Sequence, residues 1–402
     1  MRILAAFSTL ALLAIVSFAS AQGTLTPLET VHRAFAGRGS IESARLHVLE
    51  AMSGRSAAGA YGATRLEAGY GTAVDIGGGA NLLLGQPVDL FGRFRAARRQ
   101  GDAEVATARA ALRQSALDVQ QEALTAYAQL ASAQRLLRSA GQQLDIAQAL
   151  QTATRKRVEA QALPEIQNLR ADLEVERVRQ LVNDRTSAVE AARVRLAGAL
   201  GTAPPDGEAA DAIDADAVPA KDLQTTRPEL QTLFASVAQA DADLKVARQG
   251  LLPDFEIQAG KNTLNDFDNR DYGIRLQLNV PLWDHGATRE RGRAASARKS
   301  SARLLLADRL QAATRDVEAS RIDLEAAKRS VTGYRKLVDG AQTLLQKTQR
   351  GFELGANTLI DVLDSRTALS DAQELLIAAQ LRRDLAAEAL LRAQGLLLEE
   401  PK

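Results

Sequence analysis

The feature that most constrains the fold is a unit that occurs twice in the chain, at an offset of 194 residues. The offset aligns three separated pairs of segments without a gap: Gln86–Gly92 with Val280–Gly286, Val158–Ala162 with Phe352–Ala356, and Leu196–Gly201 with Leu390–Gly395. Three such matches indicate an internal duplication, so we expect both halves to form the same elements in the same order.

The duplication also sets the expected domain boundaries. Arg2 is followed by the apolar run Ile3–Val16 and then by Ala19-Ser20-Ala21, an A-x-A cleavage site, which predicts a signal peptide over residues 1–21. An N-terminal membrane anchor is the alternative, and the short apolar run disfavours it. Residues 201–226 are rich in Asp, Ala and Pro and predict a linker or short insert. The other expected parts are a first repeat 22–200 with strands at about 57–90 and helices at about 93–200, a second repeat 227–395 with strands at about 253–282 and helices at about 287–395, and a tail 396–402.

Each repeat contains a long stretch with few helix breakers, roughly 93–160 and 287–351. At 1.5 Å per residue, such a helix reaches on the order of 100 Å. Apolar residues recur every seven positions, with a second seam residue, alanine in most cases, three positions further on, which is the seam of a left-handed coiled coil. A single amphipathic surface helix is the alternative, and the length disfavours it. The seam residues are Leu310, Val317, Leu324, Val331, Val338 and Leu345 with Ala313, Ser320, Ala327, Tyr334 and Ala341, and in the first repeat Leu130, Leu137 and Leu144 with Ala126, Ala133, Ala140 and Ala147.

A turn and a returning helix follow each long helix. Thr358–Asp361 has the sequence of a capping box and predicts the start of the second returning helix. The returning helices, about 165–200 and 359–395, are shorter than their partners. Other segments therefore have to cover the remaining length, and residues 27–55 and 227–250 are the candidates.

Alternating polar and apolar residues predict β-strands ahead of the second long helix. Phe255–Gly260 alternate without error, and Tyr272–Val280 alternate over nine residues, a length that spans a membrane. The polar segment between them predicts a hairpin. In the first repeat we expect strands over 61–70 and 81–88, with Gly77–Gly79 in the loop between them.

Aromatic residues gather around these strands. Eight of the 15 aromatic residues fall within 57–94 and 251–288, which is typical of the aromatic belts of membrane strands. An ordinary sheet on a soluble core is the alternative. No later segment has 18 apolar residues in a row, so we expect a membrane to be entered only by strands. Four strands cannot close a barrel, whereas three copies would supply about twelve, which predicts an obligate oligomer.

The composition excludes several classes of function. The 50 Lys and Arg balance 49 Asp and Glu, so the basic excess of a nucleic-acid-binding protein is absent. The chain has no Cys, and His32, His47 and His285 share no ligand spacing, so we expect no metal site and no cofactor. No nucleophile–base arrangement or phosphate loop stands out, which indicates that the chain is not an enzyme.

The sequence resembles the outer-membrane efflux protein (TolC-like) family over essentially the whole chain after the signal peptide. Gly355–Asp364 (GANTLIDVLD) is the most specific segment, and it matches the tip of the family's second hairpin. Gln86–Arg93 is similar to members that serve heavy-metal exporters. The other matching segments are Arg227–Leu230 (RPEL), Ala247–Pro253 (ARQGLLP) and Asn279–Gly286 (NVPLWDHG).

The resemblance implies a mainly α fold with a membrane β-barrel portion. Long coiled-coil helical hairpins plus four β-strands per chain would assemble as a trimeric 12-stranded barrel and a periplasmic helical tunnel. Such a homotrimer lies in the outer membrane, in contact with its lipid, and extends into the periplasm. It is the passive exit duct of a tripartite efflux or secretion system and docks a periplasmic adaptor protein and an inner-membrane pump. No nucleic acid is implied.

The resemblance assigns site residues only at the tip of the second hairpin. Asp361 and Asp364 match the paired acids that ring the closed tunnel entrance. Residues three apart share a helix face, so three chains would place six carboxylates around one constriction. A solvated helix N-terminus, where Asp complements the dipole, is the alternative. The pattern R-x3-L-G, tied to adaptor contact, is matched by Arg350, Leu354 and Gly355.

The chain departs from the family at two tip positions. Phe352 and Asn357 stand where members often have Tyr and Arg, so a hydroxyl and a cation are missing. The closed state therefore has to be held otherwise or less tightly. The first hairpin has Arg157–Gln161 (RVEAQ) without Leu-Gly, which speaks against adaptor docking there.

Two other classes of protein stay open. A periplasmic adaptor is also exported and partly β, but it usually carries one helical hairpin between split β domains. A soluble periplasmic coiled-coil scaffold would have the long helices and no membrane strands.

Overall fold

The computed structural model describes residues 24–60, 62–73, 77–203, 207–209, 211–215, 222–250, 252–262 and 273–401. The expected signal peptide lies outside these residues, as do Tyr61, Phe267 and Tyr272. The helices are α1 (Pro27–Gly37), α2 (Gly39–Ala58), α3 (Arg93–Glu159), α4 (Ile166–Leu200), α5 (Leu223–Thr226), α6 (Pro228–Arg248), α7 (Ala287–Glu353) and α8 (Leu359–Gln394). The strands are β1 (Arg65–Ala73), β2 (Gly77–Val88), β3 (Asp254–Asn262) and β4 (Gly273–Asn279).

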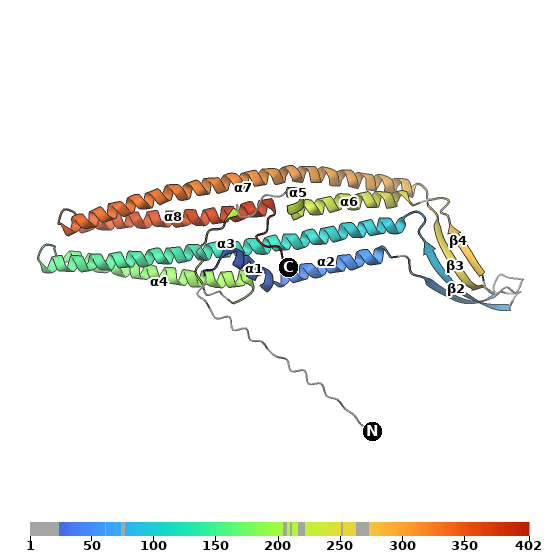
Figure 1. The fold of residues 1–402 in the computed structure, drawn as a ribbon, viewed down its shortest axis with the longest axis horizontal. Helices are drawn as coiled ribbons and strands as arrows, with labels where there is room; N and C mark the ends of the chain where they lie inside the picture. Colours follow the sequence, from blue (N-terminus) through green and yellow to red (C-terminus); the bar gives the residue numbers. More distant parts are fainter. Residues whose placement is uncertain are drawn as a thin grey trace, which may run out of the picture.

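The two long helices set the shape of the molecule. Helices α3 and α7 each have 67 residues, and their first residues, Arg93 and Ala287, stand 194 positions apart. Each follows a glycine in the left-handed region, Gly92 at φ +77° and Gly286 at φ +86°, which redirects the chain out of a strand. The sheet therefore lies at one end of the molecule and both hairpin turns lie at the other (Figure 1).

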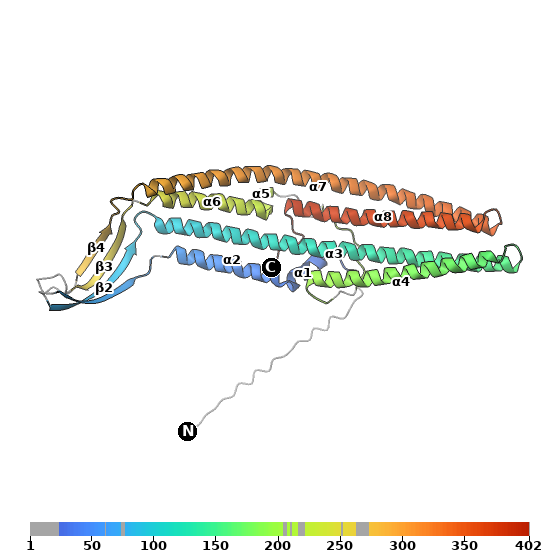
Figure 2. The same cartoon turned by 180° about the vertical axis from the view of Figure 1, so that it is seen from behind.

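Shorter helices cover the long ones in pairs. Helices α2 and α4 lie end to end along α3, and α6 and α8 lie end to end along α7 (Figures 1 and 2). The expectation that 27–55 and 227–250 complete the length of the returning helices is confirmed by α2 and α6. None of the helices in the described part of the chain is long and apolar enough to cross a bilayer.

The coiled-coil seams are confirmed as the interior of the hairpins. Leu324, Val331 and Leu345 are buried in α7, and Leu130 and Ala140 are buried in α3. The largest core lies midway along α3, where α1, α4 and α8 meet it. Its centre is Tyr127, whose hydroxyl lies 3.0 Å from the carbonyl oxygens of Leu25 and Asp211. The short connecting segments are thereby fixed to the long helix.

The four strands form one antiparallel sheet in the order β1-β2-β3-β4. Within each repeat two strands form a hairpin, and β2 pairs with β3 to join the repeats, with Leu84 opposite Ala259. The expectation that Gly77–Gly79 lie in a loop is wrong, because these residues open β2 and Gly78 pairs with Thr72. Strand pairing uses the backbone alone, so a glycine run can continue a strand when a partner strand is present.

Candidate functional site

The tip of the second hairpin is a tight turn between α7 and α8. Gly355 adopts the left-handed region at φ +81°, which a side chain would strain. The carbonyl oxygen of Gly351 accepts hydrogen bonds from the backbone N–H groups of Ala356 and Asn357, at 2.8 and 3.2 Å. The side-chain amide of Asn357 also donates a hydrogen bond to the Thr348 carbonyl oxygen at 3.3 Å. Asn357, which replaces a cation of the family pattern, thus closes the end of α7.

The predicted capping box at the start of α8 is confirmed. The Asp361 carboxylate accepts from the backbone N–H of Thr358 at 2.7 Å and from its hydroxyl at 2.8 Å. The Thr358 hydroxyl in turn accepts from the Asp361 backbone N–H at 3.2 Å. The hydrogen bond from the Thr358 backbone lowers the pKa of Asp361 below its usual value, and the hydroxyl lowers it further. Asp361 therefore caps the helix and stays ionised.

The two acidic residues of the predicted constriction share an exposed face at the tip. Asp361 and Asp364 are both exposed, whereas Val362 and Ser365, the residues one position after each of them, are buried. Within the described residues, no partner binds the Asp364 carboxylate, so its charge faces solvent. Both carboxylates are therefore exposed at the tip, the Asp361 carboxylate while capping α8.

The predicted adaptor-contact residues lie on the other side of the turn. Arg350 and Leu354 stand one helical turn apart at the end of α7, and the Leu354 N–H donates to the Arg350 carbonyl at 3.1 Å. The side chain of Leu354 is 79% exposed, an unusual position for a large apolar residue. With Gly355 beside it, this leucine forms a small apolar knob at the tip of the second hairpin.

An arginine from the first hairpin completes the tip. The guanidinium of Arg157, near the end of α3, lies over the ring of Phe352, and it donates to the Phe352 carbonyl. Phe352 is itself buried against Leu359 and Val362. The family resemblance did not assign Arg157 to the entrance. The 194-residue offset carried a signal, because it places Arg157 and Phe352 at neighbouring positions of the two repeats.

Further charged pairs join the hairpins above the tip. Arg366 of α8 is almost fully buried and forms an ion pair with Glu174 of α4. Arg177 holds the same carboxylate at 2.9 Å. Two turns further along α8, Glu374 pairs with Arg185 of α4 at 2.8 Å. The Arg366–Glu174 and Arg185–Glu374 pairs and the Arg157 contact thus connect the two hairpins at successive positions along their length.

The sheet at the opposite end has one apolar and one polar face. Directly opposed residues share a face, and the row Leu66, Leu84, Ala259 and Ile274 crosses all four strands. Ile274 is 82% exposed, and the leucines of this row are about half exposed or more. Arg275, Gln277 and other polar residues occupy the opposite face. The period-two pattern of the sequence is thus confirmed as an exposed apolar surface.

The helical layer has two uncovered edges. On α7, the edge away from α8 combines small residues with exposed Ile322, Leu337 and Leu344. A Cβ built on Gly333 or Gly340 of this edge meets no atom within 4 Å. At the far edge of the layer, α2 and α4 carry exposed apolar residues, among them Leu46, Leu49 and Met52 of α2 and Leu169, Leu173 and Val194 of α4.

Comparison with known proteins gives a consistent result. The sequence pattern of the family described as outer membrane efflux protein matches residues 48–202 and 220–396, most of the chain. The pyoverdine export outer membrane protein OpmQ of Pseudomonas aeruginosa is 28% identical over 186 residues, which cover 43% of this chain and 38% of that protein. The outer membrane protein TolC of Vibrio cholerae is 28% identical over 183 residues, 42% of each chain. The chain thus spans about two fifths of the length of these relatives.

The fold is shared more completely than the sequence. The crystal structure of the outer membrane protein VceC from Vibrio cholerae superimposes with a TM-score of 0.72 at 18% identity. The superposition covers 93% of this chain and 97% of that one. The arrangement of long helices and a terminal sheet is therefore that of a known fold.

Proposed function

The chain belongs to the outer membrane efflux protein family, and on that premise we propose that three copies form the outer-membrane exit duct of a tripartite efflux or secretion system. The strands of the three copies close one barrel of about twelve strands, and the helices continue as a tunnel into the periplasm. The duct is passive, and its partners are a periplasmic adaptor protein and an inner-membrane pump. The two repeats, 22–200 and 227–395, are its structural units.

The exposed apolar face of the sheet carries this proposal. A sheet with one apolar face and two free edges, at β1 and β4, is stable in lipid only when its edges are closed by other strands. The described residues of one chain supply four strands, too few to close on themselves. Copies of the chain are the simplest source of the rest.

The uncovered helix edges support the same assembly. The small-residue edge of α7 and the apolar edge of α2 and α4 lie at opposite sides of one layer, so each copy can present one edge to the next. A repeated contact between two different surfaces closes into a ring when the rotation is right. The open space at Gly333 and Gly340 suits the close approach of a neighbouring helix.

The oligomer is tested with a substitution at this edge. We expect a purified protein with the mass of three chains by light scattering in detergent. Gly340→Trp fills the open space, so it should convert the trimer to smaller species while the helical content stays unchanged. Thr332→Trp, exposed on the same helix but facing away from this edge, is the matched control. A monomeric mass for the unaltered chain contradicts the duct.

The tip of the second hairpin serves as the periplasmic entrance in this proposal. Asp361 and Asp364 of three copies ring the constriction, and the Arg157–Phe352 contact holds the two hairpins together in the closed state in place of the missing Tyr and Arg. Arg350, Leu354 and Gly355 contact the adaptor, because they form an exposed apolar knob with a cation beside it.

A passive duct carries whatever its pump exports, so the partner pump determines the cargo. OpmQ is named for pyoverdine export, whereas the resemblance of Gln86–Arg93 favours heavy-metal exporters. We therefore propose a metal-exporting pump as the partner. A deletion strain should lose resistance to metal ions more than to drugs in a susceptibility panel, and the reverse order contradicts this assignment.

A further inference from the structure

Each long helix carries a pair of arginines at equivalent places in its first two turns. Arg95 and Arg99 of α3 correspond to Arg289 and Arg293 of α7 by the 194-residue offset. All four residues are exposed. Within the described residues only Arg293 has an acidic partner, Glu290 at 2.7 Å. Among the residues that the structure describes, the other three guanidinium groups have no acidic partner.

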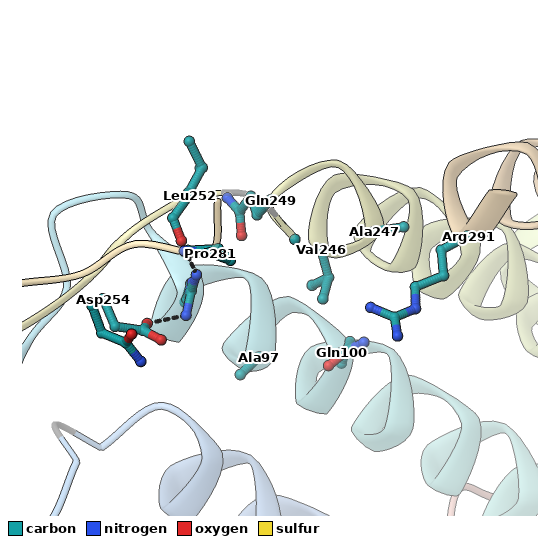
Figure 3. A pocket seen from close by; sticks show the side chains of 12 residues that line it. Ala97, Gln100, Val246, Ala247, Gln249, Leu252, Asp254, Pro281 and Arg291 are labelled. Carbon is teal, nitrogen blue, oxygen red and sulfur yellow. Dashed lines mark hydrogen bonds and ion pairs between the residues drawn. The ribbon is translucent and has the colours of Figure 1, made fainter. Parts of the chain in front are cut away.

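The helical period shows on which side these pairs lie. Ala97 and Arg291, which are also equivalent by the offset, line a pocket of about 540 Å³ with Asp254 and Asn279 (Figure 3). Asp254 and Asn279 are opposed residues on the polar face of the sheet. Each arginine of a pair stands two residues from Ala97 or Arg291, roughly 160° around the helix. The pairs therefore lie on the side of the apolar sheet face.

Exposed apolar side chains connect the sheet face to the arginine pairs. Leu90 and Phe91 precede α3, and Leu282 and Trp283, which are 91% and 79% exposed, precede α7. From the sheet toward the helices, the surface thus changes from aliphatic to aromatic to cationic. A lipid leaflet has the matching order of acyl chains, interface and phosphate groups.

We propose that the arginine pairs bind the phosphate groups of anionic phospholipids in the periplasmic leaflet of the outer membrane. The inference rests on the proposed function, because that function places the apolar face in the bilayer. A guanidinium suits this task, since its planar fork donates two parallel hydrogen bonds to a phosphate. Asp89 and Asp284 accept from the backbone N–H groups that open α3 and α7, at 2.7 and 2.6 Å, and among the described residues Glu290 pairs with Arg293 alone, so Arg95 and Arg289 are the residues to test.

The chain offers a matched control for the test. Arg109 and Arg303 are exposed, equivalent by the offset, and fourteen residues beyond Arg95 and Arg289 on the same side of the same helices. Fourteen residues of helix are about 21 Å, more than the Debye length of about 8 Å at physiological salt. These two arginines share the charge and the surface of the proposed site but lie beyond the reach of a headgroup.

The experiment measures lipid binding to the full-length protein in detergent micelles. Phosphatidylglycerol or phosphatidylcholine is titrated in, and bound lipid is counted by native mass spectrometry. For Arg95→Gln with Arg289→Gln we expect the dissociation constant of phosphatidylglycerol to rise about fivefold for each lost arginine. Arg109→Gln with Arg303→Gln should bind like the unaltered protein, and phosphatidylcholine binding should not change in either variant.

Three results overturn the inference: unchanged phosphatidylglycerol binding in the Arg95/Arg289 variant, an equal loss in the Arg109/Arg303 variant, or full displacement of the lipid by millimolar inorganic phosphate. The last result identifies a site for free anions. Flotation with neutral phosphatidylcholine vesicles separates this inference from the proposed duct. A chain that does not float contradicts the duct, whereas a floating chain without headgroup preference contradicts the lipid site alone.

Discussion

The guanidinium carbon of Arg157 lies 4.7 Å from the centre of the Phe352 ring, and the same guanidinium donates to the Phe352 carbonyl oxygen. The two residues are 195 positions apart and belong to different hairpins. Because Phe352 is buried in the second hairpin, the cation rests on a fixed ring. One side chain thereby joins the two tips of the chain.

Removing this cation should loosen the entrance. Arg157→Gln loses a cation–π contact and a charged hydrogen bond, together on the order of 2 kcal/mol. We expect channels in planar bilayers to open more often, with Arg157→Lys intermediate and the exposed Arg155→Gln unchanged. An open probability equal to that of the unaltered protein contradicts a role for Arg157 in closure.

Neutralising the acidic face of α8 should change ion conduction. Asp361→Asn keeps an oxygen that accepts from Thr358, so the capping box survives while the charge is lost. We expect Asp361→Asn with Asp364→Asn to lower cation selectivity and weaken block by divalent cations in planar bilayers. Glu353→Gln, an exposed carboxylate at the end of α7, is the control. Unaltered block removes both residues from the constriction.

The two hairpin turns should respond oppositely to glycine. Gln161 at φ +59° occupies the position equivalent to Gly355 at φ +81°. A left-handed backbone is unfavourable for a residue with a side chain, so Gln161→Gly should raise the free energy of unfolding by about 0.5–1 kcal/mol and Gly355→Ala should lower it similarly. Chemical denaturation of the detergent-solubilised protein measures both, and equal signs argue against backbone strain at these positions.

A buried carboxyl in α8 should make stability depend on pH. Burial raises the pKa of Glu388 from 4.5 to about 7, and Arg392 one turn away opposes the shift. Between these values the unfolded chain loses a proton that the folded chain keeps, so the free energy of unfolding falls as the pH rises from 4.5 to about 7. The whole effect is on the order of 3 kcal/mol.

The Glu388→Gln variant isolates this effect. It should be more stable than the unaltered protein at pH 8 and equally stable at pH 4, by thermal unfolding. The exposed Glu318→Gln should give no such difference. A Glu388→Gln variant that is less stable at both values shows that the carboxylate is needed in its charged form.

The helical part of the fold could be predicted because its signals are local and long. The seven-residue seam of α7 and the capping box at Thr358 each arise from neighbours in sequence, and both are confirmed. The alternation of Tyr272–Val280 likewise predicted a strand, and β4 forms over Gly273–Asn279. The 194-residue offset predicted that the two long helices begin at equivalent positions, which Arg93 and Ala287 confirm.

Other features depended on partners that a local pattern does not contain. Gly77–Gly79 carry no side chains to mark a strand, and only pairing with β1 makes them one. The β2–β3 pairing joins two repeats that are far apart in sequence. The contact of Arg157 with Phe352 arises from the packing of two hairpins. The sequence around each residue alone predicts only the end of a helix. The site roles of Asp361, Asp364, Arg350, Leu354 and Gly355 remain predictions.

The equal lengths of α3 and α7 restrict how the length of the helical part can change. Both helices run 67 residues without a joint, so seven residues inserted in one alone would advance its tip by about 10 Å. Arg157 and Phe352 would part, and the ion pairs of Arg366 and Arg185 would lose their partners. A longer or shorter relative of this chain therefore has to gain or lose residues in both halves together, in steps that preserve the seven-residue seam.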